Sequence, residues 1–211
     1  MMNNPAPESP AVHGGTHKDY EGSKLGMWLF LFTEILLFGG LFILYSAYRA
    51  RYPEEFHVGG GQLNSIIGIA NTFILLTSSL TMALSVAAVR KGSRRLAMGC
   101  LSGTIGLGVI FLFNKYIEWS GEIGHGLYPN SPELLQEPHG RQLFFGLYYS
   151  MTGLHGLHVF AGVILLSVML VFVNRRIITS EDFNKLENAG LYWHLVDVIW
   201  IFLLPLFYLA A

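Results

Sequence analysis

Residues 65–119 decide the fold class, and they read SIIGIANTFILLTSSLTMALSVAAV at 65–89, RKGSRR at 90–95 and LAMGCLSGTIGLGVIFLFNKYIEW at 96–119. A bilayer core about 30 Å thick needs about 20 consecutive apolar residues in a helix, and both long runs meet that length. The connection between them is short and basic. The two helices are therefore predicted to form an antiparallel hairpin across a membrane.

Three further apolar runs, at 25–48, 143–173 and 189–209, complete a predicted all-α bundle of five transmembrane helices. The composition agrees, because 52% of the 211 residues are hydrophobic and only 13% are charged, against about a quarter charged in soluble domains. We expect a single five-helix domain over residues 25–211. Residues 1–24 are polar, lack the order of a secretory signal and are expected to form a flexible tail.

The lengths of the other segments complete this outline. The run 143–173 is longer than one span requires, so this helix is expected to tilt or to project beyond the membrane. Two connections, 49–64 and 120–140, are rich in Gly or Pro and are expected to be loops.

Lys and Arg are distributed unequally between the two ends of the predicted bundle. Nine lie on the side of the N-terminus and three on the side of the C-terminus. Positive residues accumulate in cytoplasmic connections, so the N-terminus is predicted inside and the C-terminus outside. The nine are Lys18, Lys24, Arg90, Lys91, Arg94, Arg95, Arg175, Arg176 and Lys185, and the three are Arg49, Arg51 and Arg141.

Several classes of function are disfavoured by composition. The formal net charge of −1 gives no indication of a nucleic-acid partner. The single cysteine, Cys100, excludes an intrachain disulfide or a Cys-based metal cluster. In the third predicted span, Gly99 and Gly103 form a pair of small residues four apart, and Gly106 follows them. Such a face allows close helix packing in lipid.

Ionisable residues inside the predicted spans are the candidate functional residues. Each costs roughly 2.5–3.5 kcal/mol at mid-bilayer on insertion scales, so each needs a physical reason. The candidates are Glu34 in the first span, Glu118 in the third, His155 and His158 in the fourth, and His194 and Asp197 in the fifth. Glu118 lies one turn from Lys115, and we expect an ion pair between them with Lys115 snorkelling toward the membrane edge.

Three interpretations of these polar residues remain open. Hydrogen bonding between helices is favoured, because a protonated Glu34 and a neutral histidine satisfy each other without formal charge. A proton relay through Glu34, His158 and Asp197 is the second. A metal site at His155 and His158 is the third, but a helical di-metal site needs Glu-x-x-His on two helices, which this sequence lacks.

Two long motifs, TGLHGLHV at 152–159 and YWHLVDVIW at 192–200, resemble signatures of subunit 3 of the haem–copper respiratory oxidases. The segments 26–38, 63–79 and 116–119 resemble the same family in the same order. The resemblance implies the five-helix bacterial form, which lacks the first two of seven spans, in the bacterial inner membrane. It also implies phospholipid binding and a carbodiimide-reactive carboxyl at Glu34.

The resemblance further implies a chain without its own cofactor or metal and without redox catalysis. Its partners would be oxidase subunit I, which holds haem and copper, subunit II and other small subunits. We therefore expect an accessory subunit of a proton-pumping cytochrome c oxidase that stabilises subunit I and supports its proton uptake. A quinol oxidase, a nitric-oxide-reductase-associated homologue and a stand-alone transporter or proton channel are the alternatives, although the sequence shows no inverted repeat of the transporter kind.

Overall fold

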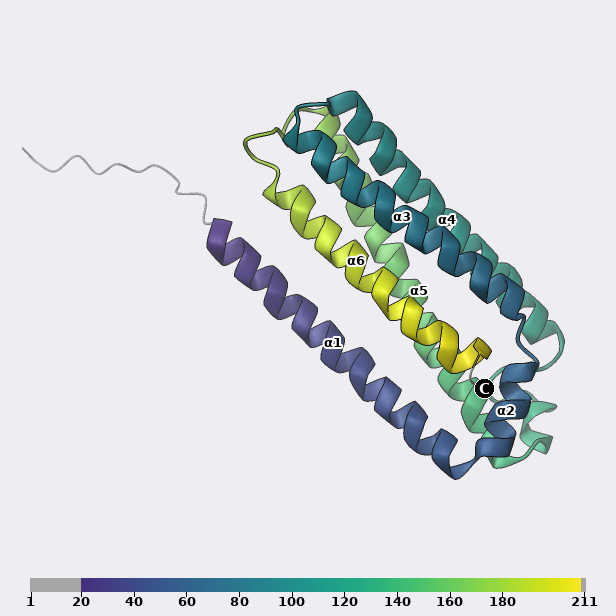
Figure 1. Ribbon diagram of the computed structural model, residues 1–211. Coiled ribbons are helices and arrows are strands. Elements are labelled where there is room, and N and C mark those ends of the chain that lie inside the picture. Colours follow the sequence, from purple (N-terminus) through teal and green to yellow (C-terminus); the bar gives the residue numbers. More distant parts are fainter. Residues whose placement is uncertain (1–19, 210–211) are drawn as a thin grey trace, which may run out of the picture.

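The computed structural model describes residues 20–209. Residues 1–19 of the predicted tail therefore lie outside the described residues, whereas residues 20–24 of it belong to the first long helix. All regular elements within 20–209 are helical, and five of them are long and apolar enough to cross a membrane, which confirms the predicted fold class (Figure 1). The helices are α1 (Tyr20–Arg51), α2 (Pro53–Gly61), α3 (Ser65–Arg90), α4 (Arg94–Gly124), the 3-10 turn η1 (Leu134–Gln136), α5 (His139–Asn174), α6 (Asn184–Leu204) and the π-helical turn η2 (Pro205–Leu209).

Helices α3 and α4 form the predicted antiparallel hairpin. Gly92 allows the tight turn between them, because its φ of 72° lies in the left-handed region, which residues with a Cβ atom rarely adopt. Small polar side chains then join the two helices inside the apolar layer. The Ser85 hydroxyl donates to the Ala97 carbonyl at 3.0 Å, and the Thr81 and Thr104 hydroxyls lie 2.8 Å apart.

The first predicted loop is wrong in part, because residues 53–61 form α2. Pro53 stands at the start of this helix, where its missing N–H costs nothing, and Glu54 and Glu55 suit the positive end of the helix dipole. Phe56 is fully buried and packs edge-on against Phe144 of α5 at 5.5 Å. The tertiary contact with α5 therefore outweighs the glycine-rich composition.

Helix α5 exceeds the length of a membrane span, as predicted. Its 36 residues correspond to about 54 Å of helix. The excess lies at its N-terminal turns, which pack against α2. Gly140, for example, lies so close to Tyr52 that an added Cβ would stand 2.8 Å from the tyrosine Cβ.

Helix α1 stands at the edge of the bundle, against α5 and α6 (Figure 1). Its inner side buries Leu31, Phe38 and Tyr45, and the Tyr45 hydroxyl donates to the Leu206 carbonyl. The rest of α1 is apolar and exposed within this chain, for example at Trp28. The other described helices leave this apolar surface of α1 uncovered.

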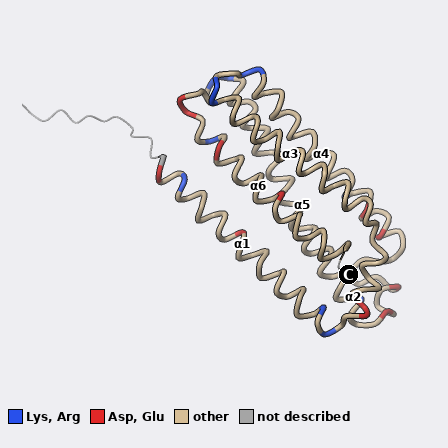
Figure 2. Tube along the Cα trace, viewed as in Figure 1, with Lys and Arg blue, Asp and Glu red and all other residues tan. Residues whose placement is uncertain are grey.

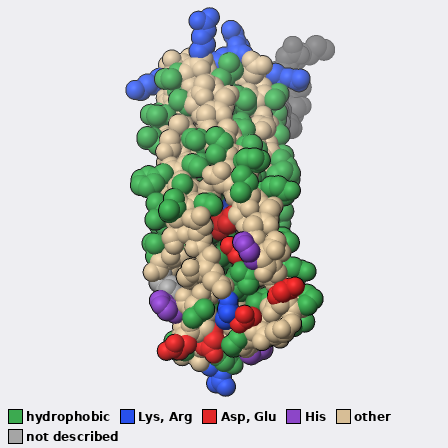
Figure 3. Space-filling model, turned by 90° about the vertical axis from the view of Figure 1, so that its right-hand side faces the viewer, with side chains coloured by type: hydrophobic (Ala, Val, Ile, Leu, Met, Phe, Trp, Pro, Cys, Tyr) green, Lys and Arg blue, Asp and Glu red, His purple; other side chains and the backbone are tan. Residues whose placement is uncertain are grey.

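The helix ends divide the bundle into two polar ends. Residues 90–95 and 175–185, with the start of α1, form what we call the basic end, and Figure 2 shows most of the Lys and Arg residues there. Residues 52–64 and 125–138 form the opposite end. Figure 3 shows hydrophobic side chains over much of one face, with Lys and Arg projecting at its top and Asp, Glu and His gathered in its lower half.

Close contacts between the long helices occur at other glycines than those predicted. An added Cβ at Gly108 of α4 would stand 2.7 Å from Trp193, and one at Gly162 of α5 would stand 2.8 Å from it. Trp193 of α6 is fully buried between them. By contrast, Gly99, Gly103 and Gly106 have no neighbouring atom within 4 Å of that position, so their predicted packing role has no counterpart inside the described chain.

Candidate functional site

Glu34 of α1 and His158 of α5 form an interhelical pair. His158 Nε2 lies 2.9 Å from a Glu34 carboxylate oxygen, and the side chains are 15% and 14% exposed respectively. His158 Nδ1 lies 2.8 Å from the Leu154 carbonyl, which only accepts, so Nδ1 carries a hydrogen. The sequence predicted that Glu34 pairs with a histidine, and the structure contains this pair.

The geometry of this pair sets how a proton is held. With Nδ1 donating, either Glu34 is protonated and donates to Nε2, or His158 is protonated and donates to the carboxylate. Both arrangements contain the same proton and the same total charge of zero. The pair can therefore pass one proton between two atoms without moving a helix. Tyr192 of α6 donates to the backbone carbonyl of His158 at 3.0 Å and holds this part of α5 in place.

His155 does not join this pair, although it lies one turn away. Its side chain is fully buried in the bundle, with its ring centroid 5.5 Å from that of Phe111 and 5.2 Å from that of Trp200. Neither ring nitrogen has a hydrogen-bond partner in the described part of the chain. His155 and His158 thus lie in different surroundings. Within residues 20–209, no group of three His, Cys, Asp or Glu side chains is placed so that it could hold a metal ion.

His194 and Asp197 of α6 share a neighbour in Ser79 of α3. The Ser79 hydroxyl lies 2.6 Å from His194 Nδ1 and also lies beside the Asp197 carboxyl. Asp197 is 3% exposed, and neither of its oxygens makes a hydrogen bond of ordinary geometry within residues 20–209. No bond of the described residues links Asp197 to Glu34 or His158, so the relay of three residues considered from the sequence is not continuous here.

Lys115 and Glu118 of α4 lie at the centre of a buried cluster. The predicted ion pair is present, with Lys115 Nζ 3.1 Å from Glu118 Oε2. The predicted snorkelling is wrong, because both residues are only 5% exposed. Lys115 Nζ donates to the hydroxyls of Tyr148 at 3.1 Å and Tyr208 at 2.9 Å, and both hydroxyls donate to Glu118 Oε1.

This cluster explains why a lysine is retained so deep in the bundle. Its ammonium group is paired with a carboxylate, hydrogen-bonded to two hydroxyls and surrounded by aromatic rings, with the Tyr148 ring centroid at 5.0 Å and that of Trp200 at 5.5 Å. The tyrosines come from α5 and η2, so the cluster ties three elements together. These two tyrosines could not be recognised from the sequence, because a tyrosine in a span resembles an ordinary packing residue.

These features define a class of protein. The chain is a multi-pass helical membrane protein whose buried polar groups join its helices in pairs and small clusters. Residues 8–211 match the family model described as cytochrome c oxidase subunit III, and the chain belongs to that family.

Curated relatives agree along nearly the whole chain. Cytochrome c oxidase subunit 3 of Thermostichus vulcanus is 32% identical over 204 residues, which cover 94% of this chain and 92% of that protein. Cytochrome bo(3) ubiquinol oxidase subunit 3 of Pseudomonas aeruginosa is 28% identical, over 94% and 90%. The haem–copper oxidase subunit I+III of Aeropyrum pernix is 28% identical over 89% of this chain and 22% of that longer protein.

Proposed function

We propose that this chain is the accessory subunit of a proton-pumping terminal oxidase of the bacterial plasma membrane, most directly a cytochrome c oxidase. It binds the catalytic subunit I, stabilises it and supports its proton uptake. Haem and copper belong to the partner subunits, which include subunit I, subunit II and further small subunits, and phospholipid surrounds or fills the remaining surface. The observation that carries the proposal is the Glu34–His158 pair, which holds one exchangeable proton within a span at a partly exposed position.

The choice of subunit I as partner rests on a relative. In Aeropyrum pernix a region similar to this chain belongs to a protein named subunit I+III, so the two subunits are one chain there. The apolar exposed side of α1 offers this chain a surface for such a neighbour. The positive end of the bundle supports an inside position for the N-terminus.

A quinol oxidase is the second candidate, because relatives named for ubiquinol and quinol oxidases match the chain over 92% of its length or more. Purification of the tagged full chain in mild detergent separates these candidates. Haem-bearing subunits are expected to copurify, and oxidation of reduced cytochrome c by the preparation identifies the donor. A chain that purifies alone and is active alone, as a transporter or channel, contradicts the accessory role.

The role of the pair is tested by Glu34→Gln. The amide still donates to His158 Nε2, so the helices stay joined, but it cannot take up or release the proton. Haem content is expected to stay unchanged while turnover or its persistence falls modestly. Glu54→Gln, at an exposed position on α2, is the matched control and is expected to behave as the unaltered protein. Complete loss of oxygen reduction in an assembled Glu34→Gln complex would assign the chain a direct catalytic role instead.

A further inference from the structure

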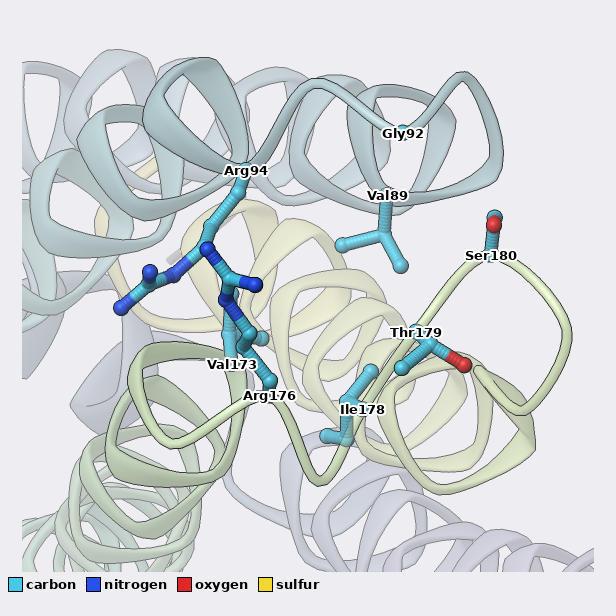
Figure 4. A pocket seen from close by; sticks show the side chains of 8 residues that line it. All are labelled: Val89, Gly92, Arg94, Val173, Arg176, Ile178, Thr179 and Ser180. Atoms are coloured by element: carbon cyan, nitrogen blue, oxygen red, sulfur yellow. The ribbon is translucent and has the colours of Figure 1, made fainter.

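Two pockets at the basic end differ in the side chains that line them. Figure 4 shows Arg94 and Arg176 in the first, which lies between the α3–α4 turn and the connection from α5 to α6. Arginine stays protonated in proteins, so these two residues exchange no proton. The second pocket lies between α3 and α6, and Arg90, Glu187 and His194 line it together with apolar residues. Its volume of about 260 Å³ is room for several water molecules, and we call it the α3–α6 groove.

The charged side chains of the α3–α6 groove compensate one another. Glu187 of α6 lies 2.7 Å from Arg90 of α3 and 3.3 Å from Lys24 of α1, and all three are partly exposed. Arg90 ends α3 and Glu187 lies in the first turn of α6, so this network stands where the groove meets water. His194 lies about two turns further along α6. The groove therefore leads from the aqueous side to a titratable ring.

A second polar layer lies behind His194. Its Nδ1 is 2.6 Å from the Ser79 hydroxyl of α3, and Ser79 in turn lies beside the Asp197 carboxyl. Asp197 is 3% exposed, and no ion pair of the described residues includes it. An unpaired charge at this burial is costly, so the carboxyl needs a group within reach that can supply a proton. Ser79 and His194 are the neighbours that can do so.

We propose that His194, Ser79 and Asp197 form a proton path from the α3–α6 groove to a buried proton-binding site at Asp197. In the loaded state the Asp197 carboxyl carries the proton, Ser79 donates to His194 Nδ1, and the ring carries its own hydrogen on Nε2. On release, the carboxyl proton passes to the Ser79 oxygen while the Ser79 proton passes to Nδ1. This step gives an imidazolium and a carboxylate, and the total charge does not change. The imidazolium then gives its Nε2 proton to water in the groove, and uptake is the reverse.

The contact between Ser79 and Asp197 is where the path opens and closes. In the structure the two side chains lie side by side without a hydrogen bond of ordinary geometry. The torsion that turns a carboxyl group is soft, so a rotation of the Asp197 side chain makes this bond without any movement of a helix. No bond of the described residues links the path to Glu34 or His158. The site rests on the membrane placement in the proposed function and not on the identity of the oxidase.

The test uses the full chain with its copurifying subunits in mild detergent. Infrared difference spectroscopy follows the stretching band of protonated carboxyl groups after a light-triggered pH jump. We expect a band that shifts when the protein contains isotope-labelled aspartate and that is absent from Asp197→Asn. The result shows whether this carboxyl exchanges its proton with the solution.

Variants of α3 test the bridging hydroxyl. Ser79→Ala is expected to slow the appearance of the band about 100-fold, because a positioned group accelerates proton transfer by at least about that factor. Ser79→Thr keeps a hydroxyl and is expected to restore most of the rate. Thr77→Ala is the matched control, because this exposed hydroxyl donates to the Phe73 carbonyl of its own helix and is expected to leave the rate unchanged.

A second pair of variants tests the groove without changing charge. Ala83→Leu narrows the groove from an exposed position and is expected to slow the band, whereas Ala70→Leu, exposed on the same helix outside the groove, is its control. A band that persists in Asp197→Asn, or no aspartate band at any pH, would overturn the proposal. Equal rates in Ser79→Ala and Thr77→Ala, or in the two leucine variants, would also overturn it. Haem is measured in the same samples, so a failed proton path and a failed oxidase assignment are distinguishable.

Discussion

Replacement of Lys115 by methionine tests whether the buried cluster stabilises the bundle. The substitution keeps the length of the side chain and removes the charge, leaving Glu118 as an unpaired carboxylate at 5% exposure. Loss of one partner from a buried ion pair costs about 3–5 kcal/mol. The Tyr148 and Tyr208 hydroxyls still donate to Glu118, so we expect the lower end of that range, about 3 kcal/mol.

The assay is unfolding of the purified chain in mixed detergent micelles with increasing sodium dodecyl sulfate, followed by circular dichroism and Tyr and Trp fluorescence. The double variant Lys115→Met/Glu118→Gln is the decisive comparison. It removes both charges and keeps an oxygen that accepts from the tyrosines, so part of the lost stability is expected to return. A Lys115→Met protein as stable as the unaltered chain would refute the reasoning. A double variant whose loss of stability equals the sum of the losses in Lys115→Met and Glu118→Gln would also refute it.

Two further substitutions follow from buried groups. His155→Phe is expected to lower the free energy of unfolding by less than about 1 kcal/mol or to raise it, because the substitution removes two unpartnered nitrogens from an aromatic site. A loss of bound metal, or a fall of several kcal/mol in the free energy of unfolding in the same assay, would show that the ring has a partner. Gly108→Ala is expected to destabilise by about 1–3 kcal/mol, because its Cβ would overlap Trp193, whereas Gly103→Ala is expected to be neutral in the isolated chain. Equal effects of the two glycine variants, measured by thermal unfolding in detergent, would contradict this assignment of the helix contact.

The sequence predicts the spans well because lipid imposes a strict requirement on length and polarity. The helices of the structure contain all five predicted runs, with ends that differ by several residues. The hairpin at 90–95 follows from the same requirement, since a connection this short leaves no other arrangement. Helix α2 was missed because its stability comes from Phe56 packing on α5, a contact between residues far apart in the chain.

The polar sites were predicted less completely, for a related reason. A charged residue in a span favours a nearby partner of opposite charge. The spacing of three residues on one helix correctly predicted Lys115 and Glu118 as such a pair. The partners on other helices depend on rotation and depth, which the sequence does not encode locally. The sequence therefore does not identify Tyr148 and Tyr208 as hydrogen-bond partners of that ion pair. It also does not distinguish Gly99 from Gly108 as a point of helix contact.

The connections of α1 have a consequence for how the chain is made. Its two interhelical hydrogen bonds described above, from Glu34 to His158 and from Tyr45 to Leu206, span 124 and 161 residues. The ribosome completes α1 first, yet its partners emerge last. Contacts that are local in sequence form faster than distant ones, so the α3–α4 hairpin is expected to close before α1 finds these partners. We therefore expect α1 to dock after this hairpin has closed, and a chain arrested before α5 to retain a detached first helix.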